Sequence, residues 1–211
     1  MIYQVDNIIK DVRVVLDQNK ISDTLAELGD VETLSLDSII ESQIEEGAKR
    51  TLAEAPVYLL DGGNNLNRSV YWNENNSGWL LLPDDFMRLI VFEMSDWERA
   101  VFSAISVDDV TYKNQSSRFK GLRGNVQRPV CAISIRPEGR VLEFYSSKTQ
   151  DAVVTRAVYL PYPKIDKYKG INISERCYKA VVYAIASLVL LIYGEIEKSN
   201  NMTELAKTSM I

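Results

Sequence analysis

The feature that most constrains the fold of this chain is an apolar run near its C-terminus, residues 180–193, which reads AVVYAIASLVLLIY. The run has fourteen residues, whereas a helix needs roughly twenty to cross the hydrocarbon core of a bilayer. Lys179 and Glu195 bracket it. A helix that is apolar on all sides is typically buried in a large core or at a contact between subunits. The run therefore predicts a central buried helix in place of a membrane span.

Two more helices are predicted in the N-terminal part of the chain. Apolar residues recur at helical spacing in residues 4–18 and again in residues 36–54. Ser35 or Asp37 would cap the second helix, because short polar side chains accept hydrogen bonds from the first free backbone N–H groups. Pro56 would end it, since the residue before a proline disfavours helical geometry.

The apolar run belongs to a third predicted helix, residues 174–197, with Ser174 as its N-cap. The last residues, KSNNMTELAKTSMI, are polar with widely spaced apolar side chains: Met202, Leu205, Met210 and Ile211. Such a tail is either mobile until a partner orders it or simply frayed. In an oligomer, those four side chains would dock on a neighbouring subunit.

Between residues 66 and 170 the pattern changes to short β-branched and aromatic runs separated by turn residues. The runs read VYW, WLLL, MRLIVFEMS, AVFSAIS, PVCAISI, VLEFYSS and AVVTRAVYLPYP. Polar turns, NENNSG and RPEGR, separate two pairs of them and predict hairpins. The spacing predicts an antiparallel sheet or small barrel of about five or six strands.

Together these patterns predict an α+β fold in which both ends of the chain build one helical bundle. The bundle would comprise residues 1–63 and 171–211, and an antiparallel β-rich region, residues 64–170, would be inserted into it. A chain of 211 residues is long enough for one large domain or two small ones.

One segment of the β-rich region is informative in its detailed order: residues 79–97, WLLLPDDFMRLIVFEMSDW. Pro83 lacks an N–H and suits a strand end or a turn. Asp84 can hydrogen-bond its own backbone and hold that turn. Phe86 then opens a second apolar run, which ends in a polar turn before Trp97. The order predicts a strand, a corner and a second strand, and a hairpin is the simplest structure with that order.

The elements on either side of this segment follow a recognisable order. A helical acidic region ending in residues 47–63 precedes it, and residues 157–163, AVYLPYP, and the long apolar helix follow it. The chain resembles the head-to-tail adaptor, or neck-ring, proteins of tailed bacteriophages, especially short-tailed and crAss-like phages. The positions that carry the resemblance are Leu82, Pro83, Asp84, Asp85, Phe86, Arg88 and Trp97. The resemblance covers most of the chain as an order of elements, but this short motif is its only sharp part.

The resemblance implies a non-enzymatic structural protein of the virion, assembled in the host cytoplasm and located at the neck or tail. It implies a homo-oligomeric ring, a dodecamer, that binds the portal protein and other tail or ring proteins. Such a ring is a conduit for genome packaging and ejection, with non-specific contact to DNA in its channel. It implies no cofactor and no membrane partner.

Charge is uneven along the chain. Residues 1–61 contain thirteen acidic and five basic residues, a net charge of -8, and the remaining residues contain sixteen acidic and nineteen basic residues, a net charge of +3. Opposite charges of this kind favour stacking of subunits. Alternatively, the acidic residues simply solvate one face of two helices.

The strongest local charge lies in residues 112–140, where seven basic residues oppose one acidic residue, Glu138. Glycines and serines in this segment predict a long exposed loop. The candidate contacts to DNA or to the portal are Lys113, Arg118, Lys120, Arg123 and Arg128. A loop of this kind binds phosphates without reading bases. The alternative is a solvated hairpin arm without a partner.

Several kinds of chemistry have no support in the sequence. The chain has no histidine, which excludes Ser-His-Asp and Cys-His nucleophile pairs, and its two cysteines are too few for a structural zinc site. Cys131 and Cys177 are predicted to be buried free thiols, which fits a reducing cytoplasm. No metal site or catalytic residue is predicted. The alternatives to the adaptor function are a carbohydrate- or protein-binding module with aromatic side chains on one sheet face, and a metal-dependent nuclease built from scattered acidic residues.

Overall fold

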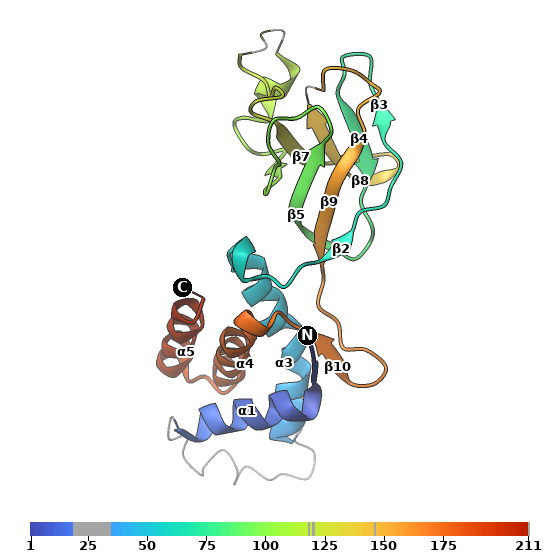
Figure 1. The fold of residues 1–211 in the computed structure, drawn as a ribbon. Coiled ribbons are helices and arrows are strands. Elements are labelled where there is room, and N and C mark those ends of the chain that lie inside the picture. The colour runs from blue at the N-terminus through green and yellow to red at the C-terminus, as the bar shows by residue number, and fades with distance from the viewer. Residues whose placement is uncertain (19–34, 118, 120, 146, 211) are drawn as a thin grey trace. The chain divides into compact units, whose positions relative to one another are not determined.

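The structure is a computed structural model that describes residues 1–18, 35–117, 119, 121–145 and 147–210. The chain forms two compact units (Figure 1). The helical unit comprises Met1–Asp61 and Pro163–Ile211, and the β unit comprises Gly62–Tyr162. The predicted α+β class, with terminal helices and an inserted β-rich region, is confirmed.

The borders of the units differ slightly from the predicted borders at residues 63 and 171. The chain returns to the helical unit at Pro163, because β10 (Gly170–Asn172) pairs antiparallel with β1 (Ile2–Gln4). This two-stranded ribbon joins the N-terminus of the chain to the segment that leads into the C-terminal helices. The terminal amine of Met1 also donates hydrogen bonds to Asn172 and Ile173.

Within the described residues the helical unit has four α-helices. They are α1 (Val5–Gln18), α3 (Leu36–Glu54), α4 (Tyr178–Ile192) and α5 (Ile196–Thr208), with the short 3₁₀ helices η1 (Val57–Leu59) and η3 (Glu175–Cys177). The two N-terminal helices are confirmed. Ser35 caps α3 as predicted, since its hydroxyl oxygen accepts from the Ser38 N–H at 3.2 Å. The predicted loop in residues 19–34 lies outside the described residues.

Helix α4 is the buried centre of this unit. Nine of its residues are buried, and they pack against α1, α3 and α5. Gly47 permits close contact with α3, because a Cβ there would lie 2.6 Å from Cγ1 of Ile185 and 3.2 Å from its backbone N. The prediction of a central buried helix is confirmed. No helix within the described part of the chain is long and apolar enough to cross a bilayer.

The predicted helix over residues 174–197 is too long at both ends. The prediction of a mobile or frayed tail after it is wrong, because most of those residues form helix α5. Gly194 adopts a φ of +77°, a conformation that ends α4, and α5 follows at once. Met202 and Met210 are buried against the protein's own core, so they are removed as docking residues for another subunit. Leu205 stays partly exposed. Ile211 lies outside the described residues.

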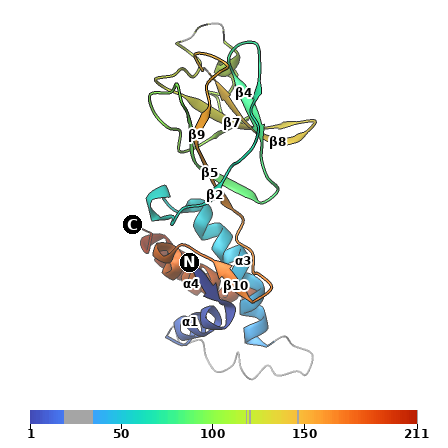
Figure 2. The ribbon, with the colours of Figure 1, turned by 45° about the vertical axis from the view of Figure 1, so that its right-hand side comes forward.

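The β unit contains two sheets that enclose one apolar core (Figure 2). The first sheet has the strand order β2 (Asn64–Asn65), β9 (Val154–Pro161), β5 (Phe86–Met94). The second has the order β3 (Tyr71–Trp72), β4 (Gly78–Leu81), β8 (Gly139–Tyr145), β7 (Val130–Arg136), β6 (Ile105–Ser106). Neighbours pair antiparallel except β6 and β7, which are parallel. Both predicted hairpins are present, but the AVFSAIS run contributes only the short β6 and a single bridge from Val101 to Phe92.

The corner after β4 carries the chain from the second sheet to the first. The Phe86 N–H donates to the Pro83 carbonyl at 3.0 Å, which closes the turn, and Phe86 is buried against Tyr159. Strand, corner and strand are confirmed, but a hairpin is wrong, because β4 pairs with β3 and β8 while β5 pairs with β9. The side chain that holds the corner is Asp85, which accepts from the Tyr159 hydroxyl at 2.9 Å, whereas Asp84 is exposed.

Trp97 is buried in the same core and completes the structural role expected of the motif. Its ring lies edge-on to Phe92 at 5.6 Å and to Phe144 at 6.2 Å between centroids. Its backbone N–H donates to the Met94 carbonyl at 3.1 Å, so the polar turn after β5 is what brings the ring back into the core.

Candidate functional site

The predicted contact residues lie in a segment between β6 and β7 that we call the basic lobe, residues 107–129. It contains five basic and two acidic residues. Lys113 begins the short 3₁₀ helix η2 (Lys113–Ser116) and is exposed, Arg128 is exposed, and Arg123 is half-buried. Arg118 and Lys120 lie outside the described residues. Three of the five predicted contact residues are therefore described by the structure, and all three lie on this one segment.

The described part of the basic lobe is largely exposed, and internal hydrogen bonds hold it. Gln115 is buried at its centre, where its amide nitrogen donates to the Thr111 carbonyl at 2.9 Å and its amide oxygen accepts from the Gly124 N–H at 2.8 Å. Asn125 closes a turn with Arg128 through paired backbone bonds. These bonds tie η2 to Gly124 and close the turn over residues 125–128.

A second anchor ties the basic lobe to the outer face of the five-stranded sheet. Glu143 on β8 is almost fully buried, and its carboxylate accepts from three side chains. Arg136 donates at 2.8 Å, the Tyr145 hydroxyl at 2.6 Å, and the Tyr112 hydroxyl of the lobe at 3.2 Å. Sequence reasoning missed Glu143, since a single acidic residue in an apolar strand run, VLEFYSS, was the only signal.

The charge state of this cluster follows from its surroundings. Burial raises the pKa of Glu143, but hydrogen bonds from Tyr145 and Arg136 outweigh burial, so the pKa of this carboxyl lies below its ordinary value. Burial and the same carboxylate raise the pKa of Tyr112 and of Tyr145, which therefore stay protonated as donors. At neutral pH the cluster is one buried carboxylate with one guanidinium and two neutral phenols.

Two other cations of the predicted basic segment serve the fold. Arg136 is paired with Glu143 and lies 5.0 Å from the Trp79 ring. Arg140 donates to the Phe86 carbonyl at 2.9 Å and lies 5.8 Å from the Phe86 ring, so it braces the corner. Neither guanidinium is available as a mobile phosphate contact.

The aromatic side chains divide between the core and the outer sheet face. Phe86 and Trp97 are buried in the core, and the partly buried Trp72 packs against it. Tyr71 stacks on Trp79 at 4.3 Å, and Trp79 also meets Arg136. Tyr71 is about half-exposed, but its ring is stacked on Trp79 and is not part of a row of free aromatic rings such as a carbohydrate platform uses.

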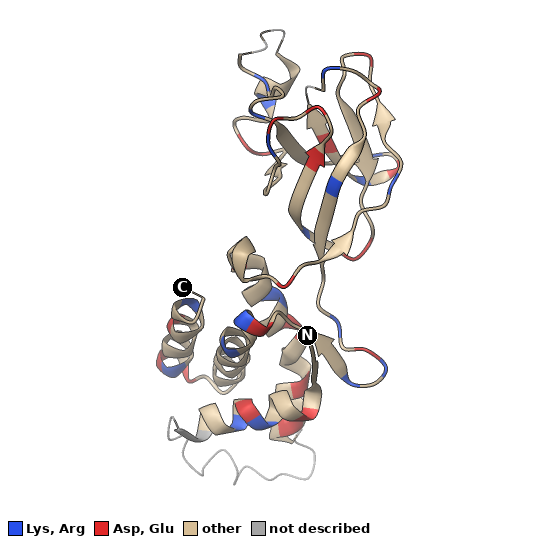
Figure 3. Ribbon diagram, in the orientation of Figure 1, with Lys and Arg blue, Asp and Glu red and all other residues tan. Residues whose placement is uncertain are grey.

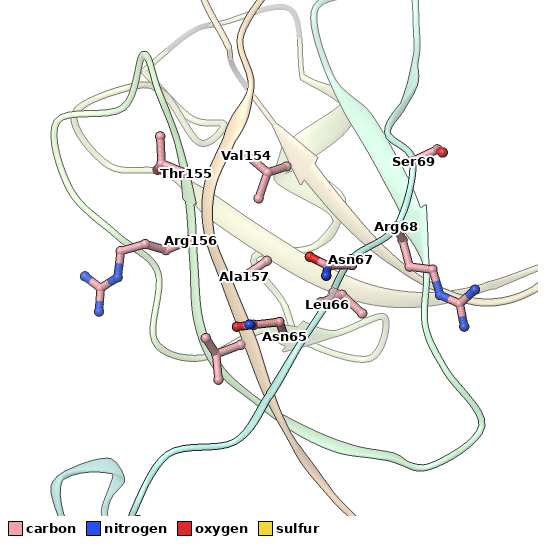
Figure 4. A pocket seen from close by; sticks show the side chains of 10 residues that line it. Asn65, Leu66, Asn67, Arg68, Ser69, Val154, Thr155, Arg156 and Ala157 are labelled. Carbon is pink, nitrogen blue, oxygen red and sulfur yellow. The ribbon is translucent and has the colours of Figure 1, made fainter.

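A shallow groove of about 630 Å³ lies where the segment after β2 crosses β9 (Figure 4). Its lining is Asn65–Ser69 on one side and Val154–Val158 on the other. The side chains of Arg68 and Arg156 point away from each other at its two borders. The groove offers amides, hydroxyls and guanidinium groups but no carboxylate, so it lacks the pair of acidic groups that acid–base hydrolysis needs.

Among the described residues, no group of three or more histidine, cysteine, aspartate or glutamate side chains is arranged to hold a metal ion. A scan against protein-family models gives no match, and a search of curated proteins gives none either. The candidate site therefore stands on the geometry of the basic lobe.

Replacing Gln115 with alanine is expected to open the basic lobe while the β unit stays folded. The change removes both hydrogen bonds of the amide, to the Thr111 carbonyl and from the Gly124 N–H, at a local cost of about 1–3 kcal/mol. Trypsin should cleave after Lys113 and Arg123 faster than in the wild type, followed by mass spectrometry. The exposed Gln127→Ala serves as the control, and equal cleavage rates in the two variants would show that Gln115 does not hold the lobe.

Proposed function

We propose that this protein is a structural subunit of a head-to-tail connector ring in a tailed bacteriophage. The ring, a dodecamer, joins the portal protein to other tail or ring proteins and surrounds the path of the genome. In this function the protein is not an enzyme, takes no cofactor and has no membrane partner. Its location is the neck or tail of the virion, after assembly in the host cytoplasm.

One observation carries the proposal: both ends of the chain build a single helical unit, and the β unit is inserted between them. This is the organisation that the resemblance to adaptor proteins leads one to expect. The motif that carries the resemblance has a structural role, because Phe86 and Trp97 are core residues and Pro83–Asp85 is the corner between the sheets. A rigid insertion of this kind suits a scaffold that presents contact surfaces.

The basic lobe is the candidate contact surface within this function. Its described cations, Lys113, Arg123 and Arg128, suit either a portal surface rich in carboxylates or the phosphates of passing DNA. Contacts to DNA would be weak for each subunit, because the genome must slide through the ring. The anchored lobe would hold these charges at fixed positions around the channel.

The location of the protein in particles tests the proposal. Virus particles from the source culture would be purified, labelled with gold-conjugated antibody against this chain, and imaged. We expect label at the head–tail junction. Label at the distal tail would instead favour a carbohydrate- or protein-binding module, and the absence both of label and of peptides from this chain would overturn a virion function.

A further inference from the structure

The groove beside β9 follows a strand edge that is only partly paired. On one side β9 pairs with β5 along its length. On the other side β2 pairs only with Val158 and Tyr159, and the Leu66 N–H adds one bond to the Ala157 carbonyl at 2.8 Å. Among the described residues, no other strand pairs with β9 on this second side. The edge of β9 at residues 154–156 is therefore open.

The local sequence explains why β2 ends so early. The Leu66 side chain is buried in the core of the β unit and holds its segment against β9 at this one point. The Arg68 N–H then donates to the Leu66 carbonyl at 3.1 Å, which forms a tight turn. After this turn the chain joins the other sheet as β3. Residues 67–69 therefore diverge from β9, and the groove of about 630 Å³ lies between them (Figure 4).

The lining of this groove suits an extended main chain with negative charge. Val154 and Ala157 supply small apolar contacts, and the asparagine and serine residues of the opposite wall supply hydrogen-bond donors and acceptors. The charged residues of the lining are Arg68 and Arg156, both exposed, and β9 carries no acidic residue (Figure 3). Arg156 also lies 3.8 Å from Glu93 on β5, whereas the Arg68 side chain stands at the other border of the groove.

We infer that this groove binds a short extended segment of another protein, which adds to the open edge of β9 as a strand and carries acidic side chains. An open strand edge is completed by the N–H and C=O groups of a second extended chain, and the bound segment would continue the ladder that β2 begins. The two arginines would attract its carboxylates. The segment is short, because Thr155 is the extra residue at a register shift between β9 and β5 and the regular edge is limited there.

The same geometry disfavours nucleic acids and sugars as the ligand. The guanidinium groups of Arg68 and Arg156 point away from each other, so they do not converge on one phosphate (Figure 4). The lining contains no aromatic ring on which a base or a sugar could stack. The inference goes beyond the proposed connector function and does not rest on it, because the strand site is defined by the β unit alone.

Peptide titration followed by NMR tests the strand site. The probe is a short acetylated and amidated peptide of alternating threonine and glutamate, added to the isotope-labelled full chain. We expect changes in the amide signals of residues 65–69 and 154–158 alone, with a Kd on the order of 0.1–1 mM for so small a contact. The same peptide with N-methylated backbone nitrogens cannot donate hydrogen bonds, so it should leave these signals unchanged.

Two matched variants test the charge. Arg68→Glu should weaken binding of the glutamate peptide roughly fivefold, and it should strengthen binding of a peptide that has lysine in place of glutamate. Arg99→Glu is the control, because Arg99 is exposed in the same unit but does not line the groove. This control variant should bind the glutamate peptide as the wild type does.

Unchanged signals at the groove, or equal binding of the N-methylated peptide, would overturn the inference. An oligothymidine of similar length that changes these signals more than the peptide does would assign the groove to nucleic acid and would also overturn it. The outcome is separate from that of gold labelling. A groove that binds no peptide leaves a connector at the neck intact, and particles that lack the protein leave the strand site intact.

Discussion

Replacement of Phe144 with alanine is expected to lower the free energy of unfolding of the β unit by about 3–5 kcal/mol. The side chain is fully buried between the two sheets. Its ring meets Trp72 at 5.3 Å, Phe92 at 5.6 Å and Trp97 at 6.2 Å between centroids. The variant would leave a cavity in this cluster, because the three surrounding rings come from β3, β5 and the turn after β5 and cannot collapse together.

Urea denaturation followed by tryptophan fluorescence measures this effect in the correct unit, since all three tryptophans of the chain lie in the β unit. The matched control is Phe102→Ala, because Phe102 is half-exposed and the same change there should stay within roughly 0.5–1 kcal/mol. If both variants lose equal stability, Phe144 is not the centre of the core. A change confined to the helical unit, followed by circular dichroism, would likewise contradict the assignment.

Local pattern was sufficient for the helices and for most of the strands. The stripes in residues 4–18 and 36–54 give α1 and α3, and the apolar run gives α4, because helical burial repeats every three to four residues within one segment. The missed helix α5 also carried a signal. Met202, Ala206 and Met210 follow the four-residue spacing of a buried stripe, and a polar majority concealed it.

The partners of the strands could not be predicted, because pairing depends on segments that are distant in sequence. Trp79–Leu82 and the run after Phe86 look like the two arms of a hairpin, yet their partners are β8 and β9. The pairing of β5 with β9 is fixed by contacts with Tyr159, which lies more than seventy residues further along the chain. The buried Phe86 ring packs on Tyr159, and the Tyr159 hydroxyl donates to Asp85. No local pattern contains that contact.

The candidate site was predicted in outline only. Composition identified the basic segment, but it could not distinguish the exposed Lys113 and Arg128 from Arg136 and Arg140, which are bound within the fold. That distinction depends on Glu143 and on the Phe86 carbonyl, and both come from other strands. Gln115, which holds the lobe, is an ordinary polar residue in the sequence.

Replacement of Glu143 with alanine is expected to lower the free energy of unfolding of the β unit by about 2–4 kcal/mol at neutral pH. The change removes the one acceptor shared by Arg136, Tyr112 and Tyr145. Arg136 keeps about a third of its side chain in solvent, so water recovers part of the loss. The basic lobe should also become more sensitive to trypsin, because Tyr112 is its link to the sheet.

The Glu143→Gln variant separates the charge of this group from its shape. The folded pKa of Glu143 is lowered, so its carboxylate stabilises the wild type above its ordinary pKa of about 4.3, and this stability is lost as the pH falls through the folded pKa. The glutamine variant lacks that dependence. The wild type should therefore be the more stable protein at pH 7, and the difference should shrink below about pH 4 as the carboxylate is protonated. Urea midpoints of both proteins between roughly pH 3 and 7 measure the difference directly. A difference that is constant over this range would mean that Glu143 acts by shape alone, and that the buried charge does not hold the lobe to the sheet.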